Sequence, residues 1–480
     1  MDTQETEESS FLIQTEVTPN NLKDLLDFIY QTYILPSSSF KNVRRITIDG
    51  EEILSFTYVG LDDSRHVDIE ITASNPVKIR VLSSETLTHT FLNKLRENLM
   101  ITIQMFEEQM RERTIYFVWV PGVEDSSESS GRKRKIIHQI FTGNMLFFFI
   151  LFLIFSYSAF LVLTVFLKMP ILYFPIVFLV TQLVMMLFSH KIVEQMGDWP
   201  ITKESPCVYI LQFNLPPKEF DEFLNKFSKE KIMEMKRKIY ERTFMLGKRL
   251  SVEAAKEVLN EFGIRIGSGN IRIKAVNIYG IVKEASRLFH IPAPKIMLSN
   301  ISIPNASASG VSPRFGLIVV TSGLLIRLDD EEILSVISHE LSHIKRRDPI
   351  ALFTLSSAEY LLRVYILWTL VYSFSLLYML FALGLIYFIA KFFESRADLD
   401  SAIATRKPQT LADALMKIGY RRTRFERALP IRIINWLRWD PHPPISFRIR
   451  RLRRLRNIDE IKHPFLKSIK DCIDGFIESI

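Results

Sequence analysis

Two histidines four residues apart mark the part of this sequence best suited to chemistry. The stretch ILSVISHELSHIKRRDP at 333–349 contains His339 and His343, with Glu340 directly after the first. In an α-helix, residues four apart lie on one face, so both imidazoles can bind one ion. Zinc favours such nitrogens, and a catalytic zinc site also holds a water whose proton the adjacent carboxylate can accept. The alternative is an amphipathic helix whose histidines only pack or cap.

Long apolar segments flank this motif and predict membrane spans. Residues 141–190 contain two apolar stretches separated by a short break at Pro170, and each is long enough for a bilayer, which takes about 20 residues. The basic run at 131–135 precedes them, so both ends of this hairpin are expected in the cytoplasm. The apolar run within 349–391 is long enough for two further crossings. A buried helical hairpin in a soluble core is the alternative for that run.

The number of crossings after the motif decides where a third metal ligand can lie. Glu359 and Arg363 interrupt the apolar run four residues apart, so they can pair and face the interior of a helix bundle. A single crossing would place every later residue across the bilayer from His339. Two crossings return the chain to the same side at Lys391.

Acidic residues follow this return point. The sequence FFESRADLDSA contains Glu394, Asp398 and Asp400. Glu394 and Asp398 share a helical face, so one can bind zinc while the other holds a ligand histidine through its second nitrogen. The alternative is an ordinary exposed acidic segment at the start of a helix.

Composition agrees with soluble segments joined to membrane spans. The chain has 480 residues, which allows two or three domains, and a mean hydropathy of +0.13. Its two cysteines, Cys207 and Cys472, do not indicate a disulfide framework, which favours a reducing, cytosol-facing location. Two of three basic runs adjoin apolar segments, as cytoplasmic membrane edges do. We expect the third, RIRRLRRLR at 448–456, to be a solvated or lipid-facing helix, and we expect no nucleic-acid partner.

The remaining segments predict soluble regions. Residues 1–122 have the pattern of an α/β domain, because strand-like segments such as HVDIEIT and VKIRVLS lie between helical ones, and a Ser-rich basic linker follows at 123–140. Within 191–348, the strand-like PKIMLS and GLIVVTS precede the histidine helix, so we expect a small sheet packed against it. Residues 392–480 are expected to add helices that carry the third ligand.

These motifs resemble the membrane-embedded zinc metallopeptidases of the HtpX/Ste24 type, peptidase family M48, and within it the HtpX-like branch. The resemblance covers about 281–455 and the earlier hairpin: an HExxH motif, the element E-x-x-A-D in ESRAD, and His-Pro-Pro followed by arginine in HPPISFRIRRL. It implies an α-helical membrane protein with four spans in two hairpins and an α+β, zincin-like catalytic domain in the cytoplasm. It also implies zinc held by His339, His343 and Glu394, with Asp398 as the partner of a ligand.

The sequence departs from the family's pattern in two places. Ser395 stands where the family usually has an aromatic residue, which affects packing near the metal and not ligation. The region before about residue 140 has no counterpart in the family's usual short amino terminus. We therefore expect an extra N-terminal soluble α/β domain that could recruit substrates, gate the site or hold partners.

Three further residues are candidates for contacts with a substrate. His442 stands before two prolines and is a candidate donor to a developing oxyanion, although an ordinary surface histidine is the alternative. The resemblance suggests Arg448 as a substrate-binding residue. Asn305 belongs to NASASGVS, whose small residues are typical of an exposed strand edge that pairs with an extended peptide; a plain turn is the alternative.

Together these features predict a zinc-dependent endopeptidase that crosses the cell membrane several times. It would cleave membrane or misfolded proteins on the cytoplasmic side, similar to the quality-control role of the HtpX branch. Its partners would be protein or peptide substrates and the lipid bilayer. Two other functions stay open. One is a prenyl-protein processing metalloprotease, which the number of spans disfavours. The other is a non-catalytic membrane scaffold with a structural metal site, which the presence of Glu340 disfavours.

Overall fold

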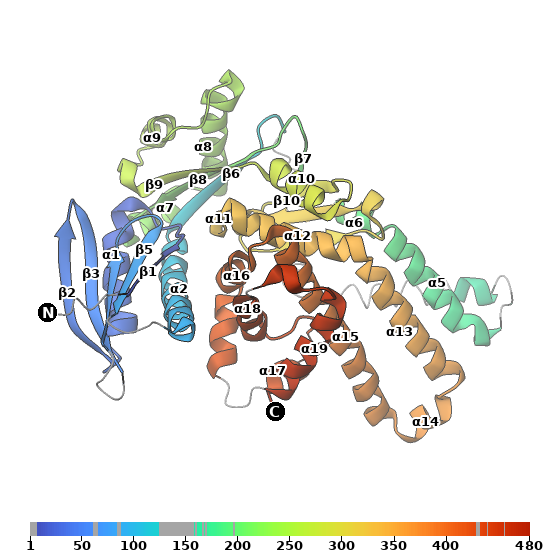
Figure 1. The fold of residues 1–480 in the computed structure, drawn as a ribbon. Helices are drawn as coiled ribbons and strands as arrows, with labels where there is room; N and C mark the ends of the chain where they lie inside the picture. The colour runs from blue at the N-terminus through green and yellow to red at the C-terminus, as the bar shows by residue number, and fades with distance from the viewer. Residues whose placement is uncertain are drawn as a thin grey trace. The chain divides into compact units, whose positions relative to one another are not determined.

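The chain forms two compact units in the computed structural model (Figure 1). The first comprises Met1–Pro121 and Val208–Val276, and the second comprises Gly122–Cys207 and Asn277–Ile480. The structure describes residues 7–60, 66–83, 88–123, 158, 161–165, 168, 170–194, 197–428, 433–438, 440–455 and 457–480.

The amino-terminal part of the first unit contains a five-stranded antiparallel sheet in the order β1-β5-β4-β3-β2. Side chains alternate between buried and more exposed along β4 and β5, as in a sheet with one face on a core. Asp49 and Gly50 join β2 to β3 with positive φ angles, which a two-residue type I′ hairpin requires. The elements are β1 (Glu7–Ile13), η1 (Pro19–Asn21), α1 (Leu22–Ile29), η2 (Tyr30–Ile34), β2 (Phe40–Ile48), β3 (Glu51–Val59), β4 (His66–Thr72), β5 (Val77–Ser83) and α2 (His89–Arg111).

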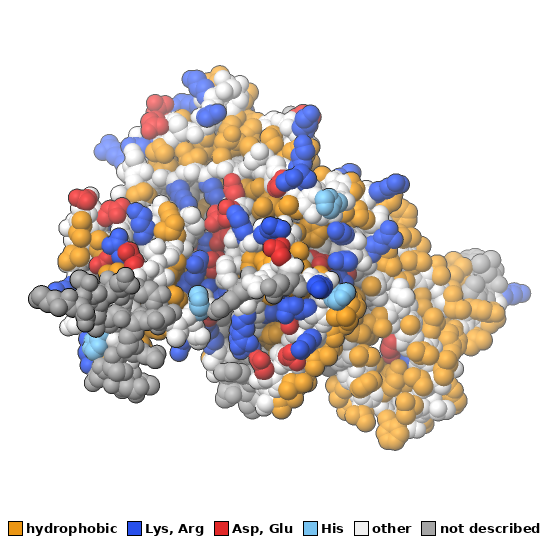
Figure 2. Space-filling model, in the orientation of Figure 1, with side chains coloured by type: hydrophobic (Ala, Val, Ile, Leu, Met, Phe, Trp, Pro, Cys, Tyr) orange, Lys and Arg blue, Asp and Glu red, His pale blue; other side chains and the backbone are white. Residues whose placement is uncertain are grey.

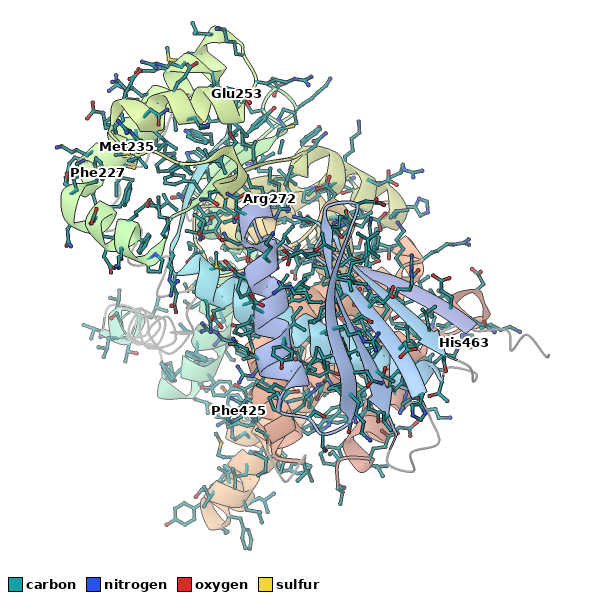
Figure 3. All side chains as sticks on the ribbon, turned by 90° about the vertical axis from the view of Figure 1, so that its left-hand side faces the viewer. Phe227, Met235, Glu253, Arg272, Phe425 and His463 are labelled. Carbon is teal, nitrogen blue, oxygen red and sulfur yellow. The ribbon has the colours of Figure 1, made fainter. Side chains whose placement is uncertain are left out.

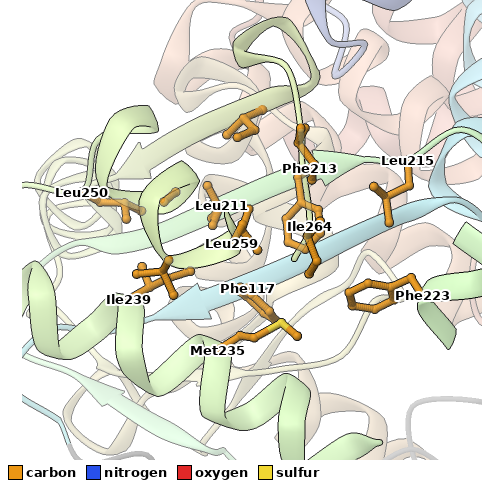
Figure 4. Packing of buried hydrophobic residues seen from close by; sticks show 14 of the residues in the cluster. Phe117, Leu211, Phe213, Leu215, Phe223, Met235, Ile239, Leu250, Leu259 and Ile264 are labelled. Carbon is orange, nitrogen blue, oxygen red and sulfur yellow. The ribbon is translucent and has the colours of Figure 1, made fainter. Parts of the chain in front are cut away.

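A second, three-stranded antiparallel sheet belongs to the same unit, in the order β6-β8-β9. Helices α7 to α9 contribute to the buried apolar cluster on this sheet, and Figure 3 labels Phe227 and Met235 among its residues. The cluster includes Phe117 and Phe213 of the strands and Met235 of α8 (Figure 4). The elements are β6 (Thr114–Trp119), β8 (Val208–Asn214), α7 (Pro217–Lys226), α8 (Lys229–Arg242), η5 (Phe244–Leu246), α9 (Val252–Glu261), η6 (Ser268–Asn270) and β9 (Ile271–Val276).

This sheet divides the region 191–348, which we expected to be continuous. Residues 208–276 share a unit with the amino-terminal segment because β8 pairs with β6, which precedes the predicted first hairpin. Arg272 Nη1 also donates to the Thr15 carbonyl at 2.7 Å. Pairing between segments so far apart leaves no local signal in the sequence, since periodicity reports only which face of an element is buried.

The second unit contains a four-stranded sheet in the order β11-β12-β10-β7, in which β10 and β12 are parallel. The strands predicted for PKIMLS and GLIVVTS are confirmed as β10 and β12. Helix α12 packs against both β11 and α10, so the small sheet lies against the histidine helix as expected. The elements are β7 (Trp199–Ile201), α10 (Ile278–Phe289), β10 (Lys295–Ser299), β11 (Ala306–Ser309), η7 (Pro313–Phe315), β12 (Leu317–Thr321), α11 (Ser322–Arg327) and α12 (Asp330–Arg346).

Both ends of α12, which carries the histidine motif, are fixed by local interactions. Asp329 Oδ1 accepts from the Glu332 backbone N–H at 2.8 Å, and Glu332 Oε2 accepts from the Asp329 N–H at 2.9 Å, which together form a capping box. Lys417 of α16 (Pro408–Ala428) donates to the same buried carboxylate at 2.8 Å. The helix ends where Arg347 adopts a φ of 57° and Pro349 follows in the first turn of the next helix.

Three helices after α12 form a hairpin: α13 (Asp348–Tyr365), the short α14 (Trp368–Ser373) and α15 (Ser375–Thr405). Much of its surface is apolar, as Figure 2 shows, and side chains such as Leu376 and Phe381 are more than two-thirds exposed, at 73% and 71%. Within the described residues, α15 is the one helix long and apolar enough to cross a membrane. An apolar surface of this extent on a charged protein marks a binding or membrane surface.

The predicted pair of charges in this hairpin faces the neighbouring helix. Arg363 Nε lies 3.1 Å from Glu359 Oε1, and Tyr378 of α15 donates its hydroxyl to the same carboxylate oxygen at 3.1 Å. The pair therefore joins α13 to α15.

Helix α5 (Phe174–Leu187) packs beside α13 and is apolar, although it is shorter than a full span. It follows η4 (Ile171–Tyr173), and α6 (Ser189–Glu194) comes after it. The Tyr365 hydroxyl donates to the Leu172 carbonyl at 2.7 Å, which ties these segments together. The linker predicted at 123–140 and most of the first half of the predicted hairpin at 141–190 lie outside the described residues.

The carboxyl-terminal helices pack around the second half of α15, and the basic run at 448–456 belongs to one of them. Our expectation of a solvated or lipid-facing helix there is wrong, because Arg448, Arg451 and Arg453 are buried. Each pairs with an aspartate on another helix: Asp398, Asp471 and Asp413, respectively. The elements are α16 (Pro408–Ala428), α17 (Ile433–Leu437), α18 (Ile445–Arg454), η8 (Ile458–Glu460) and α19 (Pro464–Ile477).

The buried ion pair between α12 and α16 gives a test of this packing. Burial raises the pKa of Glu332 to about 7 even though Lys417 lowers it. We expect Lys417→Met to destabilise the protein by about 3 kcal/mol, because it leaves a buried carboxylate without its cationic partner. The double variant Glu332→Gln/Lys417→Met removes that unpaired charge and should recover part of the loss. Thermal unfolding in detergent measures both, and a single variant as stable as wild type would contradict this role.

Candidate metal centre

Three side chains from two helices meet in the second unit. His339 and His343 project from α12, and Glu394 projects from α15; one ligand atom of each lies within 4.8 Å of the others. The two Nε2 atoms are 3.3 Å apart, and each lies 3.4 Å from an oxygen of the Glu394 carboxylate. Two imidazole nitrogens and one carboxylate oxygen thus converge on one point.

The outer nitrogens of both imidazoles face carboxylates. His339 Nδ1 lies 3.0 Å from Asp398 Oδ1, and His343 Nδ1 lies 2.8 Å from Asp348 Oδ2. Asp348 hydrogen-bonds to Nδ1 of His343, and Asp398 lies beside Nδ1 of His339 at ion-pair distance. A carboxylate at Nδ1 favours the tautomer in which the Nε2 lone pair is free for the shared point. Glu394 Oε2 is buried without a hydrogen-bond partner. This donor set fits a divalent metal ion such as zinc, which takes imidazole nitrogen and carboxylate oxygen in tetrahedral sites.

Electrostatics also favour a cation here. Burial alone would lower the pKa of His343, but its hydrogen bonds to Asp348 and Glu394 raise that pKa to about 10. The carboxylates of Asp348, Glu394 and Glu340 therefore create a negative potential at the imidazole. A metal ion would replace that proton, so metal binding competes with protonation.

Sequence reasoning missed Asp348 and also Arg396, the arginine that pairs with Asp348. Arg396 Nη2 donates to both oxygens of Asp348, so a buried guanidinium from α15 fixes the carboxylate that orients His343. The signal was present in the sequence, because Asp348 ends HIKRRD five residues after His343 and precedes the proline that starts α13. Arg396 lies within ESRAD, between the two acidic residues that were noticed.

The structure places Arg448 differently from our expectation of substrate contact. Its Nε and Nη2 donate to the two oxygens of Asp398 at 2.8 and 2.6 Å, and its side chain is buried. Burial alone would lower the pKa of Arg448, but Asp398 raises it above its ordinary value, so the guanidinium stays charged. This bidentate pair holds Asp398 beside His339, which makes Arg448 a positioning residue.

Glu340 links the candidate centre to the edge of the sheet. Its Oε2 accepts a hydrogen bond from the Ala308 backbone N–H at 2.9 Å, and burial raises the pKa of its carboxyl although the two neighbouring imidazoles lower it. Asn305 directly precedes β11, and its carbonyl accepts from the Thr321 N–H of β12 at 3.0 Å. β11 is the outer strand of the sheet, so its free edge faces Glu340.

His442 lies at the exposed rim of the same centre. Its Nε2 is 3.7 Å from Glu394 Oε2, and its side chain is 47% exposed. Its Nδ1 lies 3.0 Å from Asp440 Oδ1, which also accepts the His442 backbone N–H at 2.9 Å. Asp440 therefore fixes the ring, and sequence reasoning did not single that aspartate out.

Comparison with known proteins agrees with this arrangement. Residues 273–456 match the family model described as peptidase family M48. The chain is 34% identical over 209 residues to the protease HtpX homolog of Dictyoglomus thermophilum, covering 37% of this chain and 69% of that protein. The chain belongs to peptidase family M48. A second M48 relative, the protease HtpX homolog of Pyrococcus abyssi, is 32% identical over 41% of this chain and 78% of its own length.

Other relatives are matched over less of their length. The protease HtpX homolog of Methanothermobacter thermautotrophicus is 34% identical, and the match spans 33% of this chain and 64% of that protein. Among solved structures, the crystal structure of S. mikatae Ste24p shares 15% identity over 62% of this chain and 79% of its own, with a TM-score of 0.28. The M48 match begins at residue 273, so the sheet β1–β5 lies outside it.

The orientation of His343 by Asp348 can be tested through metal affinity. We expect Asp348→Asn to weaken metal binding about 10- to 100-fold, because an amide accepts the Nδ1 proton less well and leaves Arg396 without its ion pair. Titration of the metal-free protein with zinc against a competing chelator measures the affinity. Asp330→Asn, at an exposed position of the same helix, is the matched control. Unchanged affinity of the Asp348 variant would show that this carboxylate does not orient the ligand.

Proposed function

We propose that this M48 chain is a zinc-dependent endopeptidase of the cell membrane that cleaves membrane or misfolded proteins on the cytoplasmic side. One observation carries the proposal: Glu340 lies beside the point where His339, His343 and Glu394 converge, and it also touches the free edge of β11. A peptide laid along that edge would bring its backbone to a base and a metal site together. A scaffold with only a structural metal site needs no such neighbour.

The roles of the residues follow from their positions. Bound zinc would act as a Lewis acid toward a peptide carbonyl and lower the pKa of its water. His339, His343 and Glu394 would hold the ion, with Asp398 and Asp348 keeping the imidazoles in place. Glu340 would accept the proton of the attacking water, and its burial, which raises the pKa of the carboxyl, favours holding that proton until the leaving amine takes it.

His442 would act on the substrate's oxygen. Its ring is exposed at the rim, close to Glu394 and fixed by Asp440. Its Nε2 would face the developing oxyanion as a hydrogen-bond donor, with Asp440 at Nδ1 keeping the ring in place.

The edge of β11 supplies a place for the peptide backbone. Asn305 bonds to β12, and alternate residues of an edge strand point their N–H and C=O groups outward, so Ala306 and Ala308 share the free edge. The Ala308 N–H donates to Glu340, so the outward N–H and C=O of Ala306 would pair with an extended substrate. Such pairing uses the substrate's backbone hydrogen bonds and depends little on its side chains, which suits a protease that accepts many sequences.

The membrane part of the proposal rests on the apolar hairpin. Helices α13 and α15 expose large apolar side chains, and the Glu359–Arg363 pair with Tyr378 lies between them, as polar groups in a bundle interior do. A hairpin that crosses twice leaves His343 and Glu394 on one side of the bilayer. The segment with α5 would supply the other two spans, and the basic run at 131–135 would hold that side in the cytoplasm.

The role of the base is tested by Glu340→Gln. At equal zinc content, we expect kcat for a peptide substrate to fall about 10²- to 10⁴-fold, since the amide cannot accept the water's proton. Glu331→Gln, on the exposed first turn of the same helix, should cleave as wild type does. Cleavage by the Glu340 variant at the wild-type rate would reject the catalytic assignment.

The role of the edge is tested by Ala306→Pro, which removes the outward N–H. We expect kcat/KM for an extended peptide to fall about three- to tenfold, the value of one backbone hydrogen bond, with metal affinity unchanged. Ala306→Val keeps the N–H and adds bulk, so it separates the hydrogen bond from steric effects. Equal losses in the two variants would count against strand pairing.

A further inference from the structure

Helix α19 has one buried face, and an apolar stripe on another face is exposed. Ser468, Cys472 and Gly475 form the buried face, which packs against α15. Leu466, Ile473 and Ile477 are exposed, and so is Ile480 at the end of the chain. Residues 7 and 11 positions after Leu466 fall within about 20° of it around a helix, so these three side chains form one stripe. A surface helix of a soluble protein usually has polar side chains on its outer face in place of such a stripe.

Helix α19 lies where α15 changes from exposed to buried. Up to Leu385, α15 exposes large apolar side chains, whereas from Ala390 onward it is mostly buried in the second unit. Phe465 packs on Phe392 with ring centroids 5.1 Å apart, close to this change. If α15 leaves the bilayer at this level, α19 lies at the membrane surface.

Helix α17 lies beside it at the same level of α15, with an exposed apolar side of its own (Figure 1). Trp436 packs on Phe476 of α19 with centroids 6.0 Å apart, while Ile434 and Leu437 are exposed. Lys391 of α15 donates to the Arg438 carbonyl at 3.1 Å, which fixes the end of α17 to the same level. Both short helices therefore flank α15 where its exposed apolar part ends.

We propose that α17 and α19 form an interfacial anchor, whose exposed apolar side chains enter the same bilayer that the α13–α15 hairpin spans. This inference rests on the membrane placement in the proposed function. Two features favour lipid as the occupant. Helix α19 meets α15 where the exposed apolar part of α15 ends, since Phe465 packs on Phe392 and Phe476 on Phe388, and exposed Lys470 borders the stripe, where it would meet anionic headgroups. The anchor would fix the tilt of the candidate metal centre relative to the membrane.

The anchor can be tested by quenching with brominated lipids. A single cysteine replaces Ile473 in full-length protein carrying Cys207→Ser and Cys472→Ala, is labelled with an environment-sensitive fluorophore, and is reconstituted in vesicles of zwitterionic and anionic lipid. Leu377→Cys, in the hairpin, is the control for the membrane interior. Asp459→Cys, at the opposite end of α15 beside Arg406, is the control for water.

We expect lipids brominated near the headgroup to quench the label at 473 about two-fold or more relative to the label at 459, as for an interfacial helix. Lipids brominated near the chain end should quench the label at 377 more strongly. Quenching at 377 without quenching at 473 would overturn the anchor and leave the membrane hairpin intact. Quenching at neither position would overturn both. Disulfide-linked dimers through an unlabelled Cys at 473, without quenching, would show that a second copy covers the stripe and would also overturn the anchor.

Discussion

The position of the candidate metal centre depends on the continuity of α15. This helix has 31 residues, about 46 Å at 1.5 Å per residue, and passes from the apolar hairpin into the core of the second unit. Its buried part is held to α12 by direct bonds: Ser401 donates to the Ser335 carbonyl at 2.7 Å, and Ser342 donates to Asp400 at 2.8 Å. A helix fixes the angle between its residues. The bonds between the buried part of α15 and α12 therefore also direct Glu394 toward the histidines of α12.

Charge balance explains why so many ionised groups can be buried there. Four carboxylates surround the two imidazoles: Glu340, Glu394, Asp348 and Asp398. Two guanidinium groups oppose them, from Arg396 and Arg448. Carboxylates thus outnumber guanidinium groups around the two imidazoles, which favours a cation at the point where His339, His343 and Glu394 converge. Buried charges are costly unless they are paired, so the metal ion would stabilise the packing of α12 against α15 as well as supply chemistry.

Local patterns in the sequence predicted the parts of this centre that lie close together along the chain. The spacing of His339 and His343 predicted their common face, and an even number of crossings brought Glu394 and Asp398 to the same side; the resemblance to the M48 family then chose Glu394 as the ligand. The buried arginines of α18 escaped prediction because a run such as RIRRLRRLR has the same composition whether it is solvated or paired. Only the tertiary fold supplies Asp398, Asp413 and Asp471 as its partners. The pairing of β6 with β8 escaped for the same reason.

The hairpin and the candidate centre are joined at both ends, which would limit what the proposed peptidase can cut. Helix α13 begins at Asp348, whose carboxylate holds His343. Helix α15 becomes buried at Ala390, and Glu394 comes only four residues, or about 6 Å, later. With the hairpin in a bilayer, the metal would therefore lie about 10 Å or less from the lipid. Peptide bonds just outside the membrane would reach it directly, whereas a bond deep in a membrane span would first have to leave the lipid and unwind, since helical backbone cannot pair with the edge of β11.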